Sequence, residues 1–173
     1  MVLQLTIPAL SGDIAAALKN ELFELVPNVL IYMLSFLTIT IFWISHTNFF
    51  QIIGKVDRVL LWLNSLFLMF LALIPFPTAI ISEHPLQPLA AALYGGTMFF
   101  TSILFLLMIS YSMRTNVEME KSHRSTIIAR GTFGPVVYFK GVALSFVSPP
   151  LALLCYIIVP GFYTLAGFMD KSI

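Results

Sequence analysis

The chain has 173 residues, of which 59% are hydrophobic and 10% are charged, and its mean hydropathy is +0.96. Soluble domains carry about 45–50% apolar and about 25% charged residues, so this composition excludes an ordinary soluble domain and indicates an integral membrane protein. The net charge of +1, without a basic patch interleaved with aromatic residues, gives no reason to propose a nucleic-acid partner. The single cysteine, Cys155, excludes an intramolecular disulfide.

The hydrophobic pattern predicts an all-α, polytopic membrane helical bundle that forms a single domain over residues 1–173. A helix needs about 20 apolar residues to cross a hydrocarbon core of about 30 Å. Residues 1–10 reach only about 15 Å and are predicted to be the end of a first helix. Residues 11–24 are predicted to form a loop and an amphipathic lead-in. Five full transmembrane helices are then predicted over residues 26–46, 58–81, 88–113, 127–147 and 150–168, with a cytoplasmic linker over residues 114–130.

Lysine and arginine residues predict the orientation of these helices. Alternate loops place most basic residues on one side of the membrane, and Lys19 alone lies on the opposite side. The positive-inside rule makes the basic side cytoplasmic, so the C-terminus of this multi-pass protein is expected in the cytoplasm and the protein in the cell membrane. The residues on the basic side are Lys55, Arg58, Arg114, Lys121, Arg124, Arg130 and Lys171.

The same topology bears on residue Met1. With a cytoplasmic C-terminus and five full spans, the first helix should begin in the cytoplasm, which would leave the amino group of Met1 at membrane depth. We therefore expect about ten to fifteen residues or more of the first helix to precede Met1, from helix rise and bilayer thickness. The alternative is that Met1 is the true start and that the segment rests on the outer surface.

No arrangement of residues typical of an enzyme is present in the sequence. The three histidines, His46, His84 and His123, lie in different loops or helix ends without metal-ligand spacing. There is no glycine-rich phosphate loop, no serine nucleophile elbow and no HExxH motif. We therefore predict that the protein is not an enzyme and that it uses neither a metal nor another cofactor.

Three polar or aromatic residues near the cytoplasmic side are more informative. Trp43 and His46 close the helix predicted over residues 26–46, and Asn64 lies about two turns into the next helix, so the three have comparable depth. Trp and His at a headgroup boundary are common interfacial anchors. Alternatively, His46 and Asn64 hydrogen-bond a polar partner on a third helix, because a buried amide is costly in hydrocarbon unless it is paired.

Two further features interrupt the predicted spans. Pro75 and Pro77 remove two backbone donors and should break or kink the helix predicted over residues 58–81. A simple helix stop before the turn at residues 82–85 is the alternative to a functional hinge. Lys140 is the one charge clearly inside a span, and it is expected to snorkel, to pair with an acidic residue or to face water.

Three motifs occur together in this region: Phe42-Trp43-x-x-His46, Asp57-Arg58-x-Leu60-Leu61-Trp62-Leu63-Asn64-x-Leu66-Phe67-Leu68 and Pro75-Phe76-Pro77-Thr78. In this order they closely resemble the prokaryotic members of the transmembrane protein 175 family of potassium channels. Gly134-Pro135 and Phe146-x-Ser148-Pro149 resemble the fifth and sixth helices of that family. The resemblance covers nearly the whole chain.

The resemblance implies a six-helix subunit, four of which surround a central pore lined by the first helix. In that family the first helix carries an Arg-x-x-x-Phe-Ser-Asp signature, whose Ser and Asp are held by polar residues of the next two helices. His46 and Asn64 match those positions, with Trp43 packing beside them. The signature itself is absent here. Residues 1–5 resemble the last half of the pore helix, which makes Leu3 the candidate pore-lining residue; an ordinary lipid- or protein-facing leucine is the alternative.

We therefore predict a potassium-selective channel subunit that forms a homotetramer in the lipid bilayer. K⁺ ions would pass through a central apolar constriction, unlike filters built from rings of backbone carbonyls; no TVGYG-like loop is present. One alternative is a non-conducting membrane scaffold or an orphan fragment, because the resemblance implies that residues 1–10 hold only the end of the pore helix. Another is a secondary transporter, although that class usually shows inverted repeats and no internal repeat is evident.

Overall fold

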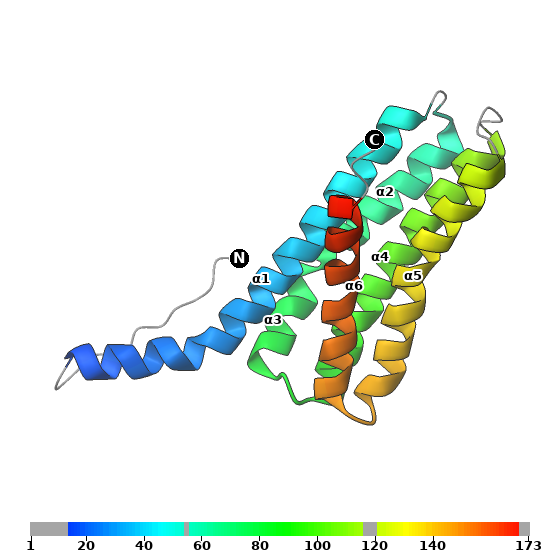
Figure 1. Cartoon of the computed structure of the whole chain (residues 1–173). Helices are drawn as coiled ribbons and strands as arrows, with labels where there is room; N and C mark the ends of the chain where they lie inside the picture. The colour runs from blue at the N-terminus through cyan, green and yellow to red at the C-terminus, as the bar shows by residue number, and fades with distance from the viewer. Residues whose placement is uncertain (1–13, 54–55, 116–120, 170–173) are drawn as a thin grey trace.

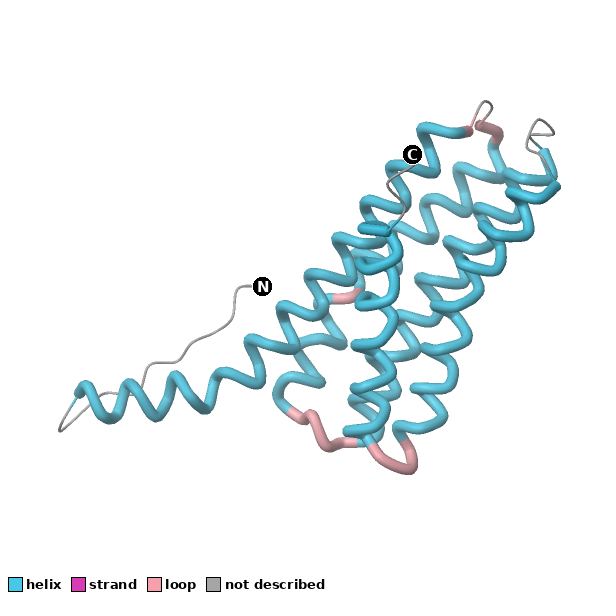
Figure 2. The backbone as a smooth tube through the Cα atoms, viewed as in Figure 1, coloured by secondary structure: helices cyan, strands magenta, loops and turns pink. Residues whose placement is uncertain are grey.

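The computed structural model describes residues 14–53, 56–115 and 121–169, which form helices joined by short turns (Figures 1 and 2). The described ranges contain no strand, so the predicted all-α class is confirmed. The helices are α1 (Ile14–Ile52), α2 (Arg58–Leu73), α3 (Pro75–Glu83), α4 (Pro88–Thr115), α5 (Lys121–Ser145) and α6 (Pro149–Met169). Residues 1–10, including Leu3, lie outside the described residues.

The helices run side by side as a bundle, with successive connections at alternate ends (Figure 1). Helix α4 packs against α2, α3, α5 and α6 and is the central element, and α5 packs against α6. Helix α1 lies on the flank of the bundle against α3 and α6, and its N-terminal part extends beyond the bundle. The end of α1, the start of α2, the end of α4 and the start of α5 gather at one end of the molecule, which we call the upper end (Figure 1).

Three segments of the described residues are long and apolar enough to cross a membrane. They are Asn28–Gln51, Arg58–Glu83 and Pro88–Thr115, and Pro149–Leu165 is a shorter apolar helix. These segments support a multi-pass membrane protein. Helix covers all or nearly all of each of the five ranges predicted to span the membrane. However, only three segments meet these criteria, so the count of five full spans remains a prediction.

Helices extend into both segments that are predicted to lie between the spans. Helix α1 begins at Ile14, so most of the loop and amphipathic lead-in predicted over residues 11–24 is helical; residues 15–17 are alanines, which favour helix. Helix α4 continues to Thr115 and α5 begins at Lys121, so most of the linker predicted over residues 114–130 is helical. Residues 121–130 contain neither proline nor glycine, so nothing local stops the helix there.

The interruption predicted at Pro75 and Pro77 is confirmed. Helix α2 ends at Leu73 and α3 begins at Pro75. The N–H of Ile74 bonds to the carbonyl of Leu71 at 3.3 Å, three residues back, because the tighter turn replaces the regular ladder. The prolines supply no N–H, so two rungs of the ladder are missing. The chain continues as helix from Pro75 to Glu83, so the helix does not stop at the prolines and ends instead within the turn predicted at residues 82–85.

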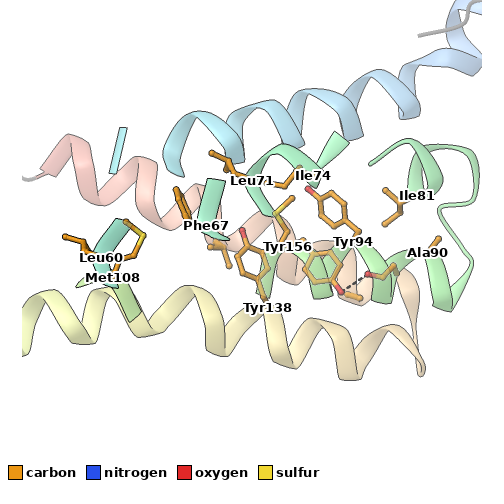
Figure 3. Packing of buried hydrophobic residues seen from close by; sticks show 14 residues of the cluster. Leu60, Phe67, Leu71, Ile74, Ile81, Ala90, Tyr94, Met108, Tyr138 and Tyr156 are labelled. Carbon is orange, nitrogen blue, oxygen red and sulfur yellow. Dashed lines mark hydrogen bonds between the residues drawn. The ribbon is translucent and has the colours of Figure 1, made fainter. Parts of the chain in front are cut away.

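The core between α4, α5 and α6 is built around buried tyrosines (Figure 3). The ring of Tyr156 enters between two glycines, Gly95 of α4 and Gly141 of α5, and a Cβ atom on either glycine would overlap that ring. The Tyr156 hydroxyl donates to the carbonyl of Ala91 at 3.0 Å. Glycine at these two positions therefore lets one aromatic side chain tie three helices together.

Candidate functional site

The structure brings His46 of α1 and Asn64 of α2 into direct contact near the upper end of the bundle. The distance between His46 Nε2 and Asn64 Oδ1 is 2.7 Å. His46 lies five residues before Gln51 and Asn64 six residues after Arg58, so each is about 8–9 Å inside its apolar segment. The comparable depth predicted for the two residues is confirmed. They bond to one another, whereas the sequence argument named a partner on a third helix.

The donors and acceptors of His46 and Asn64 are only partly used by the bond between them. The amide oxygen of Asn64 can only accept, so His46 Nε2 is the donor. In the neutral ring, His46 Nδ1 then carries a lone pair, and Asn64 Nδ2 keeps two N–H donors. No other described residue forms a hydrogen bond with either side chain. The pair can therefore bind one more polar group, such as a hydroxyl or a carboxylate.

Aromatic rings hold the imidazole of His46 in place. The ring of Phe67 in α2 stacks on it nearly parallel, with centroids 5.4 Å apart and an angle of 12° between the planes. The ring centroid of Phe50 lies 4.8 Å from that of His46. Phe67 in turn packs against Phe105 of α4, with ring centroids 5.3 Å apart. Phe67 is fully buried. This packing fixes the direction of the imidazole, as a precise polar contact requires.

Trp43 lies beside the pair but remains on the surface of the subunit. Its ring stacks on His46 at 6.1 Å, one helical turn away, and 57% of the side chain is exposed. The structure thus brings together Trp43, His46 and Asn64 from two helices. An exposed indole at this depth fits both an interfacial anchor and a contact with a further helix.

A second polar contact at the upper end went unpredicted. Asp57 caps the N-terminus of α2, where its Oδ1 accepts from the N–H of Leu60 at 2.9 Å. Its Oδ2 accepts a hydrogen bond from the hydroxyl of Tyr111 in α4. The bond from Tyr111, followed by the bond from Leu60, lowers the pKa of Asp57 below its ordinary value of 3.8. Asp57 therefore fastens the start of α2 to the end of α4 as a carboxylate.

The sequence reasoning also missed a cluster of buried hydroxyl groups from Ser35, Thr78 and Tyr94. The available signal was the presence of hydroxyl side chains inside apolar spans, one of them in the Pro75–Thr78 motif. Within the described residues, no group of three or more His, Cys, Asp or Glu side chains is placed to hold a metal ion.

The fold and this site define a polytopic helical membrane protein whose helices are joined by specific polar contacts. The sequence pattern of the family described as "Endosomal/lysosomal potassium channel TMEM175" matches residues 1–75, which include Trp43, His46 and Asn64. A potassium channel of Streptomyces collinus is 31% identical over 94% of this chain and 82% of its own length. The chain therefore belongs to the TMEM175 family of ion channels.

Two further comparisons agree with this assignment. A potassium channel of Chamaesiphon minutus is 28% identical over 91% of this chain and 82% of its own length. The crystal structure of a lysosomal potassium-selective channel TMEM175 homolog from the same organism has a TM-score of 0.79 and 26% identity. The matched region includes 88% of this chain and 80% of the chain in the crystal structure. The resemblance to prokaryotic members is confirmed, and since the family is one of channels, so is the prediction that the protein is not an enzyme.

Proposed function

We propose that this chain is the subunit of a potassium-selective channel that conducts K⁺ passively through an apolar constriction at the centre of a homotetramer. The observation that carries the proposal is the His46–Asn64 pair, which lies within the apolar segments and has two amide donors that no described residue accepts. A polar pair at this depth is expected to have a function, because unpaired donors in hydrocarbon are costly. The similar proteins named potassium channels supply the identity of the ion.

In this proposal the pair holds the pore-lining first helix. Asn64 Nδ2 would donate to a hydroxyl or carboxylate of that helix, and Trp43 would pack against it with its exposed ring. Leu3 would contribute to the apolar constriction, where passage depends on pore width and wetting rather than on rings of carbonyl oxygens. The residues assigned to this function are thus Leu3 for the pore and Trp43, His46 and Asn64 for the orientation of the first helix.

We also propose that the upper end of the bundle faces the cytoplasm of the cell and that the C-terminus lies on the same side. Arg58 at the start of α2 and Arg114 at the end of α4 are both exposed at this end. The Asp57–Tyr111 contact supports their placement at one end, because it joins the residue before Arg58 to the last turns of α4. The positive-inside rule favours the cytoplasmic side for such a cluster.

The proposal is tested by reconstituting the purified protein into liposomes loaded with K⁺. We expect a K⁺ flux that follows the gradient without saturating, and a tetramer in native mass spectrometry. Parallel vesicles loaded with Na⁺, or carrying a pH gradient, measure selectivity. Saturable uptake coupled to a second gradient would instead identify a secondary transporter. Tetramers that carry no flux would identify a scaffold.

A further inference from the structure

Three buried hydroxyl groups from three helices meet at the interruption between α2 and α3. Ser35 of α1, Thr78 of α3 and Tyr94 of α4 are each at least 96% buried. Thr78 Oγ1 lies 2.9 Å from Ser35 Oγ, and Ser35 Oγ lies 3.2 Å from Tyr94 Oη, so the three hydroxyls are within hydrogen-bond distance of one another in a chain. Figure 3 shows Tyr94 beside Ile74, the residue at which the helix is interrupted. We call these three residues the hydroxyl cluster.

The hydroxyl cluster differs from the usual arrangement, in which a hydroxyl group hydrogen-bonds only within its own helix. Ser and Thr in apolar helices commonly donate to a carbonyl of their own helix, which ties no two helices together. Thr97 does this with Leu93 at 3.0 Å. The hydroxyls of Thr78 and Ser35 also reach carbonyls of their own helices, at 2.8 and 3.0 Å, so each shares its one hydrogen between its own helix and the cluster. The contacts among Ser35, Thr78 and Tyr94 instead connect residues 43 and 59 positions apart.

The hydroxyl cluster provides a second point at which α1 is attached to the rest of the bundle. Helix α1 packs chiefly against α3 and α6, and α3 is joined to α2 through a ladder that lacks the N–H groups of Pro75 and Pro77. Ser35 lies eleven residues from His46, about 16 Å along α1. Helix α1 is thus held at two depths: by His46 and Asn64 near the upper end, and by the hydroxyl cluster deeper in the bundle.

We propose that Ser35, Thr78 and Tyr94 are positioning residues that fix α1 to α3 and α4 and thereby set the placement of the pore-lining segment preceding α1. This inference rests on the proposed function. It assigns the Pro75–Thr78 motif a role: the prolines free α3 from the regular ladder of α2, and Thr78 couples that short helix to α1. Loss of the cluster leaves the His46–Asn64 pair intact and loosens the helix at mid-membrane depth.

The test replaces Thr78 by Val, which keeps the shape of the side chain and removes its hydroxyl. Purified variants are reconstituted into liposomes, and both the K⁺ flux per assembled tetramer and the K⁺/Na⁺ flux ratio are measured. We expect Thr78→Val to change flux by about three- to twenty-fold, the range for loss of one interhelical hydrogen bond in a membrane. Thr78→Ser, which keeps the hydroxyl, should behave as wild type. Thr97→Val is the matched control, because its buried hydroxyl bonds only within α4 among the described residues.

A second measurement does not depend on conduction. The melting temperatures of Ser35→Ala, Thr78→Val and the double variant form a double-mutant cycle, which should be non-additive because the two hydroxyls bond to each other. Additive effects, or a Thr78→Val flux equal to that of Thr97→Val, would overturn the inference. A wild-type protein without K⁺ flux would overturn the proposed function, and the cycle would then decide alone whether the two hydroxyls tie α1 to α3.

Discussion

At the scale of single residues, several polar side chains of this protein form hydrogen bonds between different helices. Hydrogen bonds between membrane helices contribute about 0.6 kcal/mol on average and up to about 1.7 kcal/mol. Removing one partner of such a bond lowers stability by more, about 1–3 kcal/mol, because the donor that stays behind is buried without an acceptor. His46 and Asn64, at 2.7 Å, are such a pair, and the parallel ring of Phe67 limits the freedom of the imidazole to find another partner.

The substitution Asn64→Leu removes the acceptor of His46 and both amide donors. We expect it to destabilise the subunit by about 1–3 kcal/mol, because His46 Nε2 loses its partner, and to weaken tetramer assembly or K⁺ flux. Ser65→Ala is the control, since the neighbouring Ser65 is exposed and donates to Leu61 of its own helix. Native mass spectrometry and liposome flux measure the two effects. Potassium flux equal to that of Ser65→Ala would remove the proposed role of the pair.

Asp57 gives a residue-scale prediction that depends on pH. Hydrogen bonds from Tyr111 and Leu60 lower the pKa of Asp57 in the folded protein below 3.8, its ordinary value. A lowered pKa means that the ionised form stabilises the fold, so this stabilisation is present above about pH 4 and is lost as the pH falls through the folded-state pKa.

We therefore expect the melting temperature of the wild type to fall more steeply below pH 4 than that of Asp57→Asn. The Asn variant keeps a capping oxygen for Leu60 but carries no titrating group. Glu83→Gln serves as the comparison, because Glu83 is exposed at the other end and has no hydrogen-bond partner among the described side chains. Identical acid profiles for the wild type and Asp57→Asn would contradict this account.

At the scale of helices, glycine allows neighbouring helices to pack around a buried ring, and proline interrupts a helix. The ring of Tyr156 occupies the space that side chains on Gly95 and Gly141 would fill, so α4, α5 and α6 share one contact. Adjacent Gly96 differs, because in the described part of the chain no atom outside its own stretch of helix backbone lies within 4 Å of the place where its Cβ would be. Two neighbouring glycines on one helix thus have different roles, set by which side of α4 each one faces.

These two glycines make a matched pair for mutagenesis. Gly95→Ala forces the new methyl group into the buried ring of Tyr156, and we expect a loss of about 1–3 kcal/mol from overpacking. Gly96→Ala should be neutral or stabilising by up to about 1 kcal/mol, because alanine is the better helix former and meets no neighbour. Thermal unfolding in detergent compares them. A Gly95→Ala variant as stable as Gly96→Ala would show that the ring of Tyr156 can move aside.

At the scale of the whole molecule, the distribution of charge sets the orientation in the membrane. Arg58 and Arg114 lie at the upper end, with the start of α5. If this end faces the cytoplasm, the next crossing after the α5–α6 turn returns the chain to the same side. The orientation is therefore a property of the assembled bundle and of the difference in basic residues between its two ends.

We accordingly expect a green fluorescent protein fused to the C-terminus to fluoresce in bacterial cells, because it matures in the cytoplasm. Alkaline phosphatase fused at the same position, which needs the oxidising periplasm, should be inactive. The reverse pattern would place the upper end outside the cell. It would also remove the cytoplasmic assignment of Trp43, His46 and Asn64.

The sequence alone determined the class of this protein and the sites of its irregularities. Apolar composition predicts membrane helices, and the missing N–H groups of Pro75 and Pro77 predict the interruption, because both effects are local to the chain. Motif spacing placed His46 and Asn64 at one depth. Helix ends were less predictable: helix extends over residues 14–24 and 121–126, which lie outside the predicted spans.

Only the tertiary structure decided which side chains meet. The contacts Asp57–Tyr111, Ser35–Thr78–Tyr94 and Tyr156 with its two glycines join residues far apart in the chain. Such contacts depend on the rotation of each helix about its own axis, and each residue along a helix turns the side chain by about 100°. In helices that are apolar all round, no contrast between polar and apolar faces fixes that rotation. Packing between neighbouring helices fixes it instead, and packing is a property of the folded chain.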